Sequence, residues 1–286
     1  MAKVLVTLWV LFFLTSCKLL YRSDVETVKG PLIFSVMGDV PRSASEDTLL
    51  QKQIAAHNIY SQSEFMIHVG DIKTGGEPCD EAVYIKVADY LKKLDVPTFI
   101  VPGDNEWNDC TNPDQAWAFW VKHFLKFQNN WDQNYEIEYQ QQHEENIAWI
   151  TKDVLMIGIN MVGGRVFNQV IWNELLERDA DWIKEQMKEK GELVKAMVVF
   201  AQANPDERHT LFMNRFRELV KEFQKPVLYL HGDGHRWLYD NPWLEENMIR
   251  VQVDQGGIAL PLEILISFES DSIFHFERNP YPLISD

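Results

Sequence analysis

The chain has 286 residues, of which 46% are hydrophobic and 12% aromatic, so it can bury the core of one large domain or two small ones. Its formal net charge of -16 argues against a nucleic acid or an anionic membrane surface as a partner. The acidic excess is compatible with simple solubility, and part of it can consist of carboxylates that require cations.

Residues 1–16 have the features of an export signal. Lys3 provides a positive charge, and the apolar run over 4–14 is too short to span a bilayer. The small residues before Cys17 resemble the cleavage site of bacterial lipoproteins, which implies a lipid on Cys17 and a membrane-anchored location on the periplasmic or outer-membrane side. An ordinary signal peptide or a short anchor is the alternative. We expect residues 17–30 to form a tether and residues 31–286 a single domain.

The first part of the domain alternates between strand and helix patterns. Strands are expected at 31–37, 65–69 and 98–101, and helices at about 46–60 and 80–94. Each strand ends in a Gly-Asp turn, namely Gly38-Asp39, Gly70-Asp71 and Gly103-Asp104. Alternation of this kind predicts a mainly parallel sheet, in which right-handed crossovers place the strand carboxyl ends at one edge. The three aspartates are therefore expected along that edge.

The second half contains a fourth turn of the same kind. We expect a helical aromatic segment at 113–131, a polar surface loop or insertion at 132–146, a hairpin over 147–159, helices at 174–190 and 211–223, and strands at 196–200, 226–230, 248–253, 262–268 and 272–276. The strand at 226–230 leads into His231-Gly232-Asp233-Gly234-His235. Trp107 and the aromatic residues of 117–127 fit a core position or, alternatively, the wall of a substrate cleft.

Four converging carboxylates need a compensating charge. Two like charges about 4 Å apart repel by about 4 kcal/mol at an effective dielectric constant near 20. Lys73, Arg42, Arg165 and Arg236 are the few basic side chains near the turns. Divalent cations solve the problem better, because oxygen ligands favour Mg²⁺, Mn²⁺ or Ca²⁺, and His235 is tolerated by Mn²⁺, Fe or Zn²⁺. Paired metals are a common apparatus for hydrolysing phosphate esters.

The order Gly-Asp, Gly-Asp, Pro-Gly-Asp-Asn-Glu, a polar strand end and Gly-Asp-Gly-His resembles the five-motif signature of calcineurin-like metallophosphoesterases, over about residues 31–276. The resemblance implies an α/β fold, a four-layer αββα sandwich, with two bridged metals and a metal-bound hydroxide that attacks phosphorus. For this chain we expect one or two divalent metals. By position it implies a set of candidate metal ligands, which are Asp39, Asp71 (bridging), Asp104, Gln202, Asp233 and His235.

The chain departs from the family pattern at several histidine positions. Pro41 stands in place of the first-motif histidine, Asp233 replaces a last-motif histidine, and Gln202 or Asn204 stands at the fourth motif. Asn105 occupies the position of the catalytic histidine and is followed by Glu106. Because most replacements keep ligand capacity, we interpret the site as reworked toward hard cations. The whole variant pattern, from Gly-Asp-x-Pro through Gly-Asp-Asn-Glu-Trp to His-Gly-Asp, resembles a divergent bacterial subgroup of the family.

Asn105, Glu106 and Lys73 are the candidate catalytic residues. Asn105 is a poor proton donor, so protonation of the leaving group is left to solvent or to an unassigned group. Lys73 can bind substrate phosphate or offset the carboxylates. We expect His68 to be a core residue or to support a ligand, and His231 to support a ligand by a hydrogen bond.

Cys79 and Cys110 follow two different Gly-Asp turns. An exported protein meets an oxidising compartment, so we expect a disulfide that ties the two loops together, with two free thiols as the alternative.

These features predict a metal-dependent phosphoester hydrolase of the cell envelope that acts on a phosphorylated small molecule or another ester. A nucleotide or lipid pyrophosphate is an alternative substrate. A non-catalytic metal-binding or receptor module on the same fold is the alternative function.

Overall fold

The computed structural model describes residues 30–283. The expected signal peptide, the lipid site at Cys17 and almost all of the tether lie outside the described residues. Within residues 30–283, no helix combines the length and the apolar character that crossing a membrane requires.

The described chain forms five α-helices and twelve strands. The helices are α1 (Ala44–Tyr60), α2 (Glu81–Leu91), α3 (Pro113–Phe124), α4 (Gln169–Lys190) and α5 (Thr210–Phe223). The strands are β1 (Leu32–Met37), β2 (Met66–His68), β3 (Thr98–Ile100), β4 (Glu138–Gln140), β5 (His143–Thr151), β6 (Val154–Gly158), β7 (Ala196–Ala201), β8 (Val227–His231), β9 (Leu238–Asp240), β10 (Met248–Gln252), β11 (Leu262–Ile266) and β12 (Phe274–Glu277).

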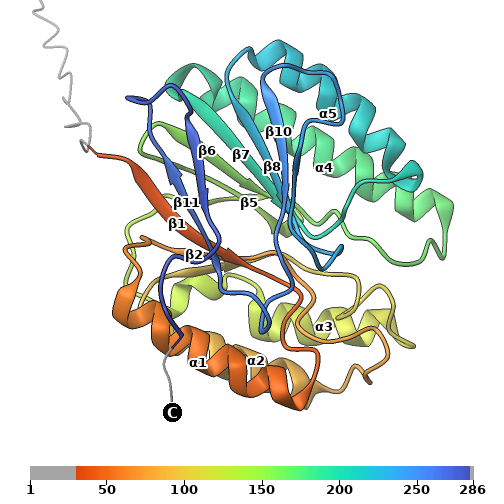
Figure 1. Ribbon diagram of the computed structural model, residues 1–286. Coiled ribbons are helices and arrows are strands. Elements are labelled where there is room, and N and C mark those ends of the chain that lie inside the picture. The colour runs from red at the N-terminus through yellow and green to blue at the C-terminus, as the bar shows by residue number, and fades with distance from the viewer. Residues whose placement is uncertain (1–29, 284–286) are drawn as a thin grey trace, which may run out of the picture.

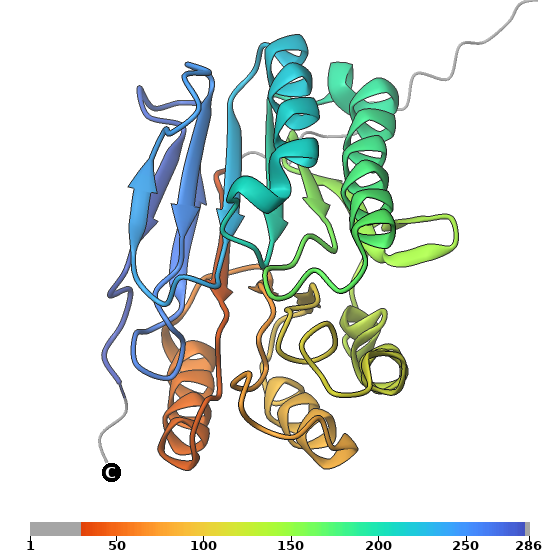
Figure 2. The same ribbon diagram turned by 90° about the vertical axis from the view of Figure 1, so that its right-hand side faces the viewer.

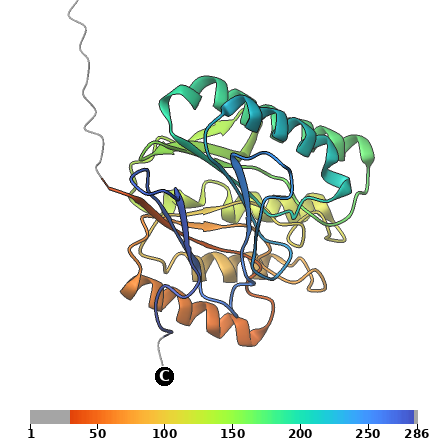
Figure 3. The same ribbon diagram turned by 45° about the horizontal axis from the view of Figure 1, so that its top comes forward.

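The strands form two sheets that pack face to face. One has the order β12-β11-β1-β2-β3 and the other β4-β5-β6-β7-β8-β10-β9. Helices α1, α2 and α3 cover the five-stranded sheet, and α4 and α5 cover the seven-stranded sheet (Figure 1). Turned views show the same four layers from other sides (Figures 2 and 3). The predicted αββα sandwich is therefore confirmed.

Three apolar clusters hold the layers together. The central cluster lies between the sheets, where Phe99 stacks on Trp149 with ring centroids 4.1 Å apart. The other two clusters join each sheet to its own helices. Strands β1, β2 and β3 are buried on both faces, which explains why their sequences are continuously apolar.

Strand pairing places the turns as expected. Strands β1, β2 and β3 run parallel, and so do β6, β7, β8 and β10. Their carboxyl ends therefore lie at one edge of each sheet, and the edges of the two sheets meet at the candidate site.

The structure corrects several expected boundaries. The segment 132–146 is not a plain loop, because it contains β4 and the start of β5. Strand β4 lies at the edge of its sheet and keeps exposed and half-buried polar side chains, so it lacks an apolar pattern. Helix α4 begins at Gln169 instead of 174; its first turn is exposed, and Asn168 caps it. The edge strand β9 was not predicted either, because its three residues are too few to show a periodic pattern.

Candidate metal centre

The loops after β1, β2 and β3 lie in direct contact. The Asp39 amide donates to the carbonyl of Gly70 at 3.0 Å. A Cβ on Gly70 would lie 2.6 Å from the amide nitrogen of Gly103, and Gly70 also has a φ of +84°. Glycine is required there because the backbone is left-handed and another main chain passes directly beside it. The Gly-Asp motif thus allows the loops that carry the carboxylates to pack closely.

Asp39, Asp71 and His235 converge at this edge. Each offers one ligand atom, and the three atoms lie within 4.8 Å of one another. Nε2 of His235 is 3.2 Å from Oδ1 of Asp39. Asp39 is completely buried, and its Oδ2 has no hydrogen-bond partner among the described residues. A buried carboxylate oxygen without a partner is costly, so two carboxylates, an imidazole and this orphaned atom fit a divalent cation.

The backbone at the centre is unusual. The φ angles are +54° at Asp39, +60° at Asp71, +67° at Asp233 and +57° at His235. Residues other than glycine rarely adopt this left-handed conformation, which costs on the order of 1 kcal/mol or more. Four such residues in one place indicate that the fold holds these side chains in a functional arrangement.

Asp71 is buried among other charged groups. Its Oδ2 accepts a 2.6 Å hydrogen bond from Nδ2 of Asn105 and lies 3.9 Å from Nη1 of Arg42. Burial raises the pKa of Asp71 well above its ordinary value, and the charges of Asp104, Glu106 and Asp39 raise it further. Positive charge next to Asp71, such as that of a divalent cation, would favour its ionised form.

Asp104 and Gln202 form a pair next to the three-residue cluster. Nε2 of Gln202 donates to Oδ1 of Asp104 at 3.0 Å, and Oε1 of Gln202 accepts from the amide of Gly163 at 2.7 Å. Burial raises the pKa of Asp104 to about 6. The structure brings both predicted ligands to the site, but there they bond to each other.

Asp233 joins the site from the seven-stranded sheet. Its amide donates to Oδ1 of Asp39 at 3.2 Å, and its Oδ2 accepts from the amide of Asn204 at 3.4 Å. Burial, together with the charge of Asp39, raises the pKa of Asp233.

Two of the candidate catalytic residues hold the loops. Oε1 of Glu106 accepts from the amides of Gly103 at 2.5 Å and Asp71 at 3.1 Å. Burial raises the pKa of Glu106 to about 7. Nζ of Lys73 donates to the carbonyls of Thr74 and Glu77 at 3.0 and 2.8 Å. The side chain of Lys73 is buried, and burial lowers its pKa. Catalytic roles for Asn105, Glu106 and Lys73 stay predictions.

A disulfide connects two loops of the site. Cys79 and Cys110 are bonded, with their Cα atoms 6.0 Å apart, which confirms the predicted pair. Their sulfur atoms lie 3.8 and 3.6 Å from the carbonyl oxygen of Asn105. The bridge therefore supports the segment that presents Asn105 to Asp71.

Two buried histidines stand beside the turns. Nδ1 of His68 accepts from the Gly70 amide at 3.2 Å, and burial lowers the pKa of His68 to about 4. Nδ1 of His231 lies 2.9 Å from the carbonyl of Gly232, and burial lowers its pKa to about 3. Both are neutral residues that bond to turn backbone.

Sequence reasoning missed Arg208. Its guanidinium bonds to Asp206 and to the carbonyl of Gly164, and its charge acts on Asp233 and Asp104. A Cβ on Gly164 would lie 2.7 Å from Oδ2 of Asp104, so the loop that Arg208 holds packs directly on that carboxylate. Arg208 follows no Gly-Asp turn, and the residues around it form no motif that would predict its place at the site.

Comparison with protein-family models finds no match, and comparison with curated protein sequences finds none either. Solved structures do match. A dimetal phosphatase from Danio rerio is similar with a TM-score of 0.57 and 10% identity, over 82% of this chain and 93% of that one. A Plasmodium protein described as the anchor in the inner membrane complex has a TM-score of 0.54 and 12% identity, over 87% and 89%. A purple acid phosphatase from yellow lupin has a TM-score of 0.50 and 9% identity, over 84% and 50%.

These matches define the class of fold. The chain has the calcineurin-like metallophosphoesterase fold, with two sheets flanked by helices. At these identities the likeness concerns architecture, so the activity has to be argued from the residues of the site.

Proposed function

We propose that this protein is a metal-dependent phosphoester hydrolase. The observation that carries the proposal is the convergence of Asp39, Asp71 and His235, within 4.8 Å, at the edge of a metallophosphoesterase fold. A divalent metal bound there would polarise a phosphoester and activate water for its hydrolysis.

Side chains around the cluster can bind the substrate and orient the metal ligands. Arg42 lies 3.9 Å from Asp71 and its side chain is 19% exposed, so this guanidinium is a candidate to pair with a phosphate oxygen. Asn105 donates its amide to Asp71 and fixes the orientation of that carboxylate. An amide is not an acid, so protonation of the leaving group falls to solvent or to a group not yet assigned.

The test measures metal binding and turnover together. Purified protein is loaded with Mn²⁺, and hydrolysis of an aryl phosphate monoester and a diester is followed. We expect Asp71→Asn to lose bound metal and at least 10²-fold in kcat. Asp179→Asn is the matched control, because Asp179 is also a buried carboxylate with a raised pKa but lies outside the cluster. Unchanged turnover in Asp71→Asn would reject the proposal.

A second candidate is a non-catalytic metal-binding or receptor module. The observation that favours it is Asn105, which stands where the resemblance implies a catalytic histidine and bonds to Asp71. The similar Plasmodium structure is described as an anchor, so this fold is compatible with such a role. Metal bound at stoichiometric amounts without hydrolysis of any phosphoester in a broad panel would favour this candidate.

We also propose a cell-envelope location through a lipid on Cys17. The support is the sequence of residues 4–17 alone. Mass spectrometry of the mature N-terminus tests it, with Cys17→Ser as the variant that should release the protein from membranes. Recovery of an unmodified Cys17 would contradict it.

A further inference from the structure

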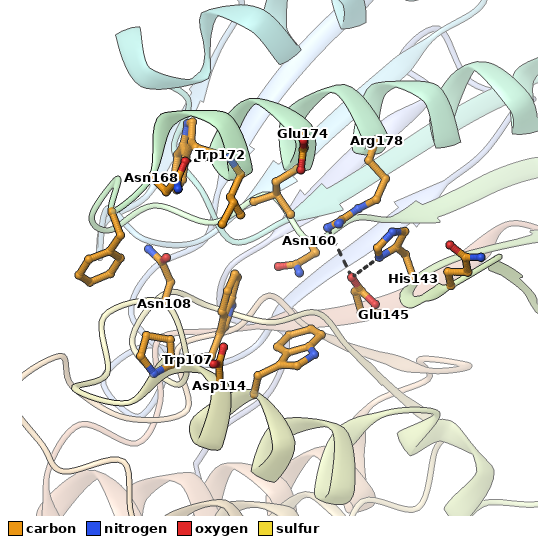
Figure 4. Close-up of a pocket in the computed structure, with 16 residues that line it drawn as sticks. Trp107, Asn108, Asp114, His143, Glu145, Asn160, Asn168, Trp172, Glu174 and Arg178 are labelled. Carbon is orange, nitrogen blue, oxygen red and sulfur yellow. Dashed lines mark hydrogen bonds and ion pairs between the residues drawn. The ribbon is translucent and has the colours of Figure 1, made fainter.

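A cavity lies outside the metal cluster. It has a volume of about 500 Å³ and is bounded by the segment after β3, the hairpin between β4 and β5, and the start of α4 (Figure 4). Asp39, Asp71 and His235 do not line it. The volume falls within the range of about 300–1,000 Å³ that is typical of small-molecule sites.

Aromatic rings form its apolar walls. Trp107 and Trp117 line one side, with ring centroids 5.1 Å apart and planes inclined by 60°. Trp117 also stacks on the buried Trp120, at 5.2 Å and 5°, which fixes the orientation of its ring. Trp172 of α4 lines the cavity from the other side (Figure 4). Phe167 stands at the same cavity and is 60% exposed, although an aromatic ring of this size is usually covered.

One end of the cavity is polar. Glu145 lies between Arg178 at 3.5 Å and His143 at 3.6 Å, as the dashed lines of Figure 4 show. The Glu145 side chain is only 8% exposed. Among the described residues, Arg178 is the one lysine or arginine that lines the cavity, and its charge is already paired. The exposed carboxylates of Asp114 and Glu174 add negative charge, so the cavity disfavours an anionic ligand.

Amide groups add donors and acceptors along the walls. Asn160 lines the cavity and is 2% exposed, and its Oδ1 has no hydrogen-bond partner within residues 30–283. Asn108 also lines the cavity, and its Nδ2 donates to the carbonyl of Arg165 at 3.0 Å. An amide or carboxylate side chain can accept from a ligand hydroxyl, and an amide or imidazole can also donate to one.

We propose that this cavity binds a neutral saccharide. A sugar ring has an apolar face of C–H groups, which packs on an indole, and an edge of hydroxyls, which needs both donors and acceptors. The angled pair of Trp107 and Trp117 provides the first surface, and Asn160 with the Glu145 and His143 end provides the second. A phosphate or a nucleotide would find no unpaired cation there. An organic cation would gain from the tryptophans but would leave the amides without partners.

The test uses a panel of neutral oligosaccharides on a glycan array, followed by calorimetric titration of the strongest binder. Choline and AMP serve as the cationic and anionic comparison ligands. Asp114→Trp places a large ring at the exposed rim of the cavity, and Gln115→Trp is the control, since Gln115 is exposed and does not line it. We expect Asp114→Trp to weaken binding at least tenfold and Gln115→Trp to change it less than twofold.

Saccharide binding is also measured with Asp71→Asn, which is expected to lose phosphoester hydrolysis. The saccharide proposal can therefore fail or succeed independently of the hydrolase proposal. Glu145→Gln is a second variant, expected to weaken binding while the thermal unfolding transition stays cooperative. Three outcomes would overturn the saccharide assignment. They are no neutral glycan binding, binding of choline or AMP alone, and equal affinity in Asp114→Trp and Gln115→Trp.

Discussion

The backbone amide of Asp233 donates to Oδ1 of Asp39 at 3.2 Å, across 194 residues of sequence. Asp39 follows β1 of the five-stranded sheet, and Asp233 follows β8 of the seven-stranded sheet. The same Asp39 oxygen lies 3.2 Å from His235. The bond therefore joins the two sheets at the candidate metal centre, so the position of the candidate ligand His235 depends on how the sheets pack.

Bound metal should stabilise the fold. At a metal concentration of 100 times Kd, linkage adds about 2.7 kcal/mol to the free energy of unfolding, which corresponds to a rise in Tm of roughly 5–10 °C. We expect Mn²⁺ to raise the Tm of chelator-treated protein in this range, and Asp39→Asn to abolish the rise, because an amide replaces the unpartnered Oδ2. Scanning calorimetry measures both. No shift with Mn²⁺, Mg²⁺, Zn²⁺ or Ca²⁺ would contradict a metal centre.

Gly103 should not tolerate alanine. A Cβ there would lie 2.2 Å from the amide nitrogen of Asp71 and 2.3 Å from its Oδ1. We expect Gly103→Ala to lower the free energy of unfolding by about 2 kcal/mol or more and to weaken metal binding, since the Asp71 loop must move. Gly76→Ala is the control, because its Cβ would meet nothing within 4 Å. Urea denaturation measures the stability of both variants, and metal titration measures their affinity for metal. Equal urea midpoints for Gly103→Ala and Gly76→Ala would argue against the close approach of Gly103 to Asp71.

Removal of the disulfide should affect both stability and the site. Cys79 and Cys110 are 31 residues apart, so closure of this loop is worth about 3–4 kcal/mol in the chain-entropy model. We expect the double variant Cys79→Ser, Cys110→Ser to unfold at lower urea concentration and to bind Mn²⁺ more weakly, because both sulfurs lie against the Asn105 carbonyl. If metal affinity is retained while stability falls, the bridge supports the fold without positioning Asn105.

Asp179 should make stability depend on pH. It is completely buried, accepts from Nδ2 of Asn146 at 2.8 Å, and burial raises its pKa to about 7. The folded state then binds a proton that the unfolded state has released, so the free energy of unfolding decreases as pH rises from about 4 to about 7. The decrease is up to about 4 kcal/mol.

Asp179→Asn imitates the protonated form and should remove most of this dependence. The variant is then more stable than the native chain at pH 8 and similar to it at pH 4. Urea denaturation at several pH values measures the slope, with the exposed Asp89→Asn as the control. Parallel pH profiles for the native chain and Asp179→Asn would show that Asp179 ionises normally.

Several features followed from the sequence because their causes are local. A short apolar run that ends in Gly-Asp predicts a buried strand with a carboxylate at its end, and Asp39 and Asp71 stand in such positions. Cys79 and Cys110 were paired from their place after two such turns. Strands β4 and β9 were missed because each is an edge strand of three residues, which is too short to show periodicity.

The sequence by itself determined the alternation of elements, the Gly-Asp turns and the kinds of ligand that they carry, since these depend on neighbouring residues and on backbone preference. The tertiary structure alone decided which of the predicted ligands meet. It grouped Asp39 and Asp71 with His235, and it paired Asp104 with Gln202. It also turned Lys73 toward backbone carbonyls. Those outcomes depend on the packing of two sheets whose strands are far apart in sequence, and no local pattern encodes distances of that kind.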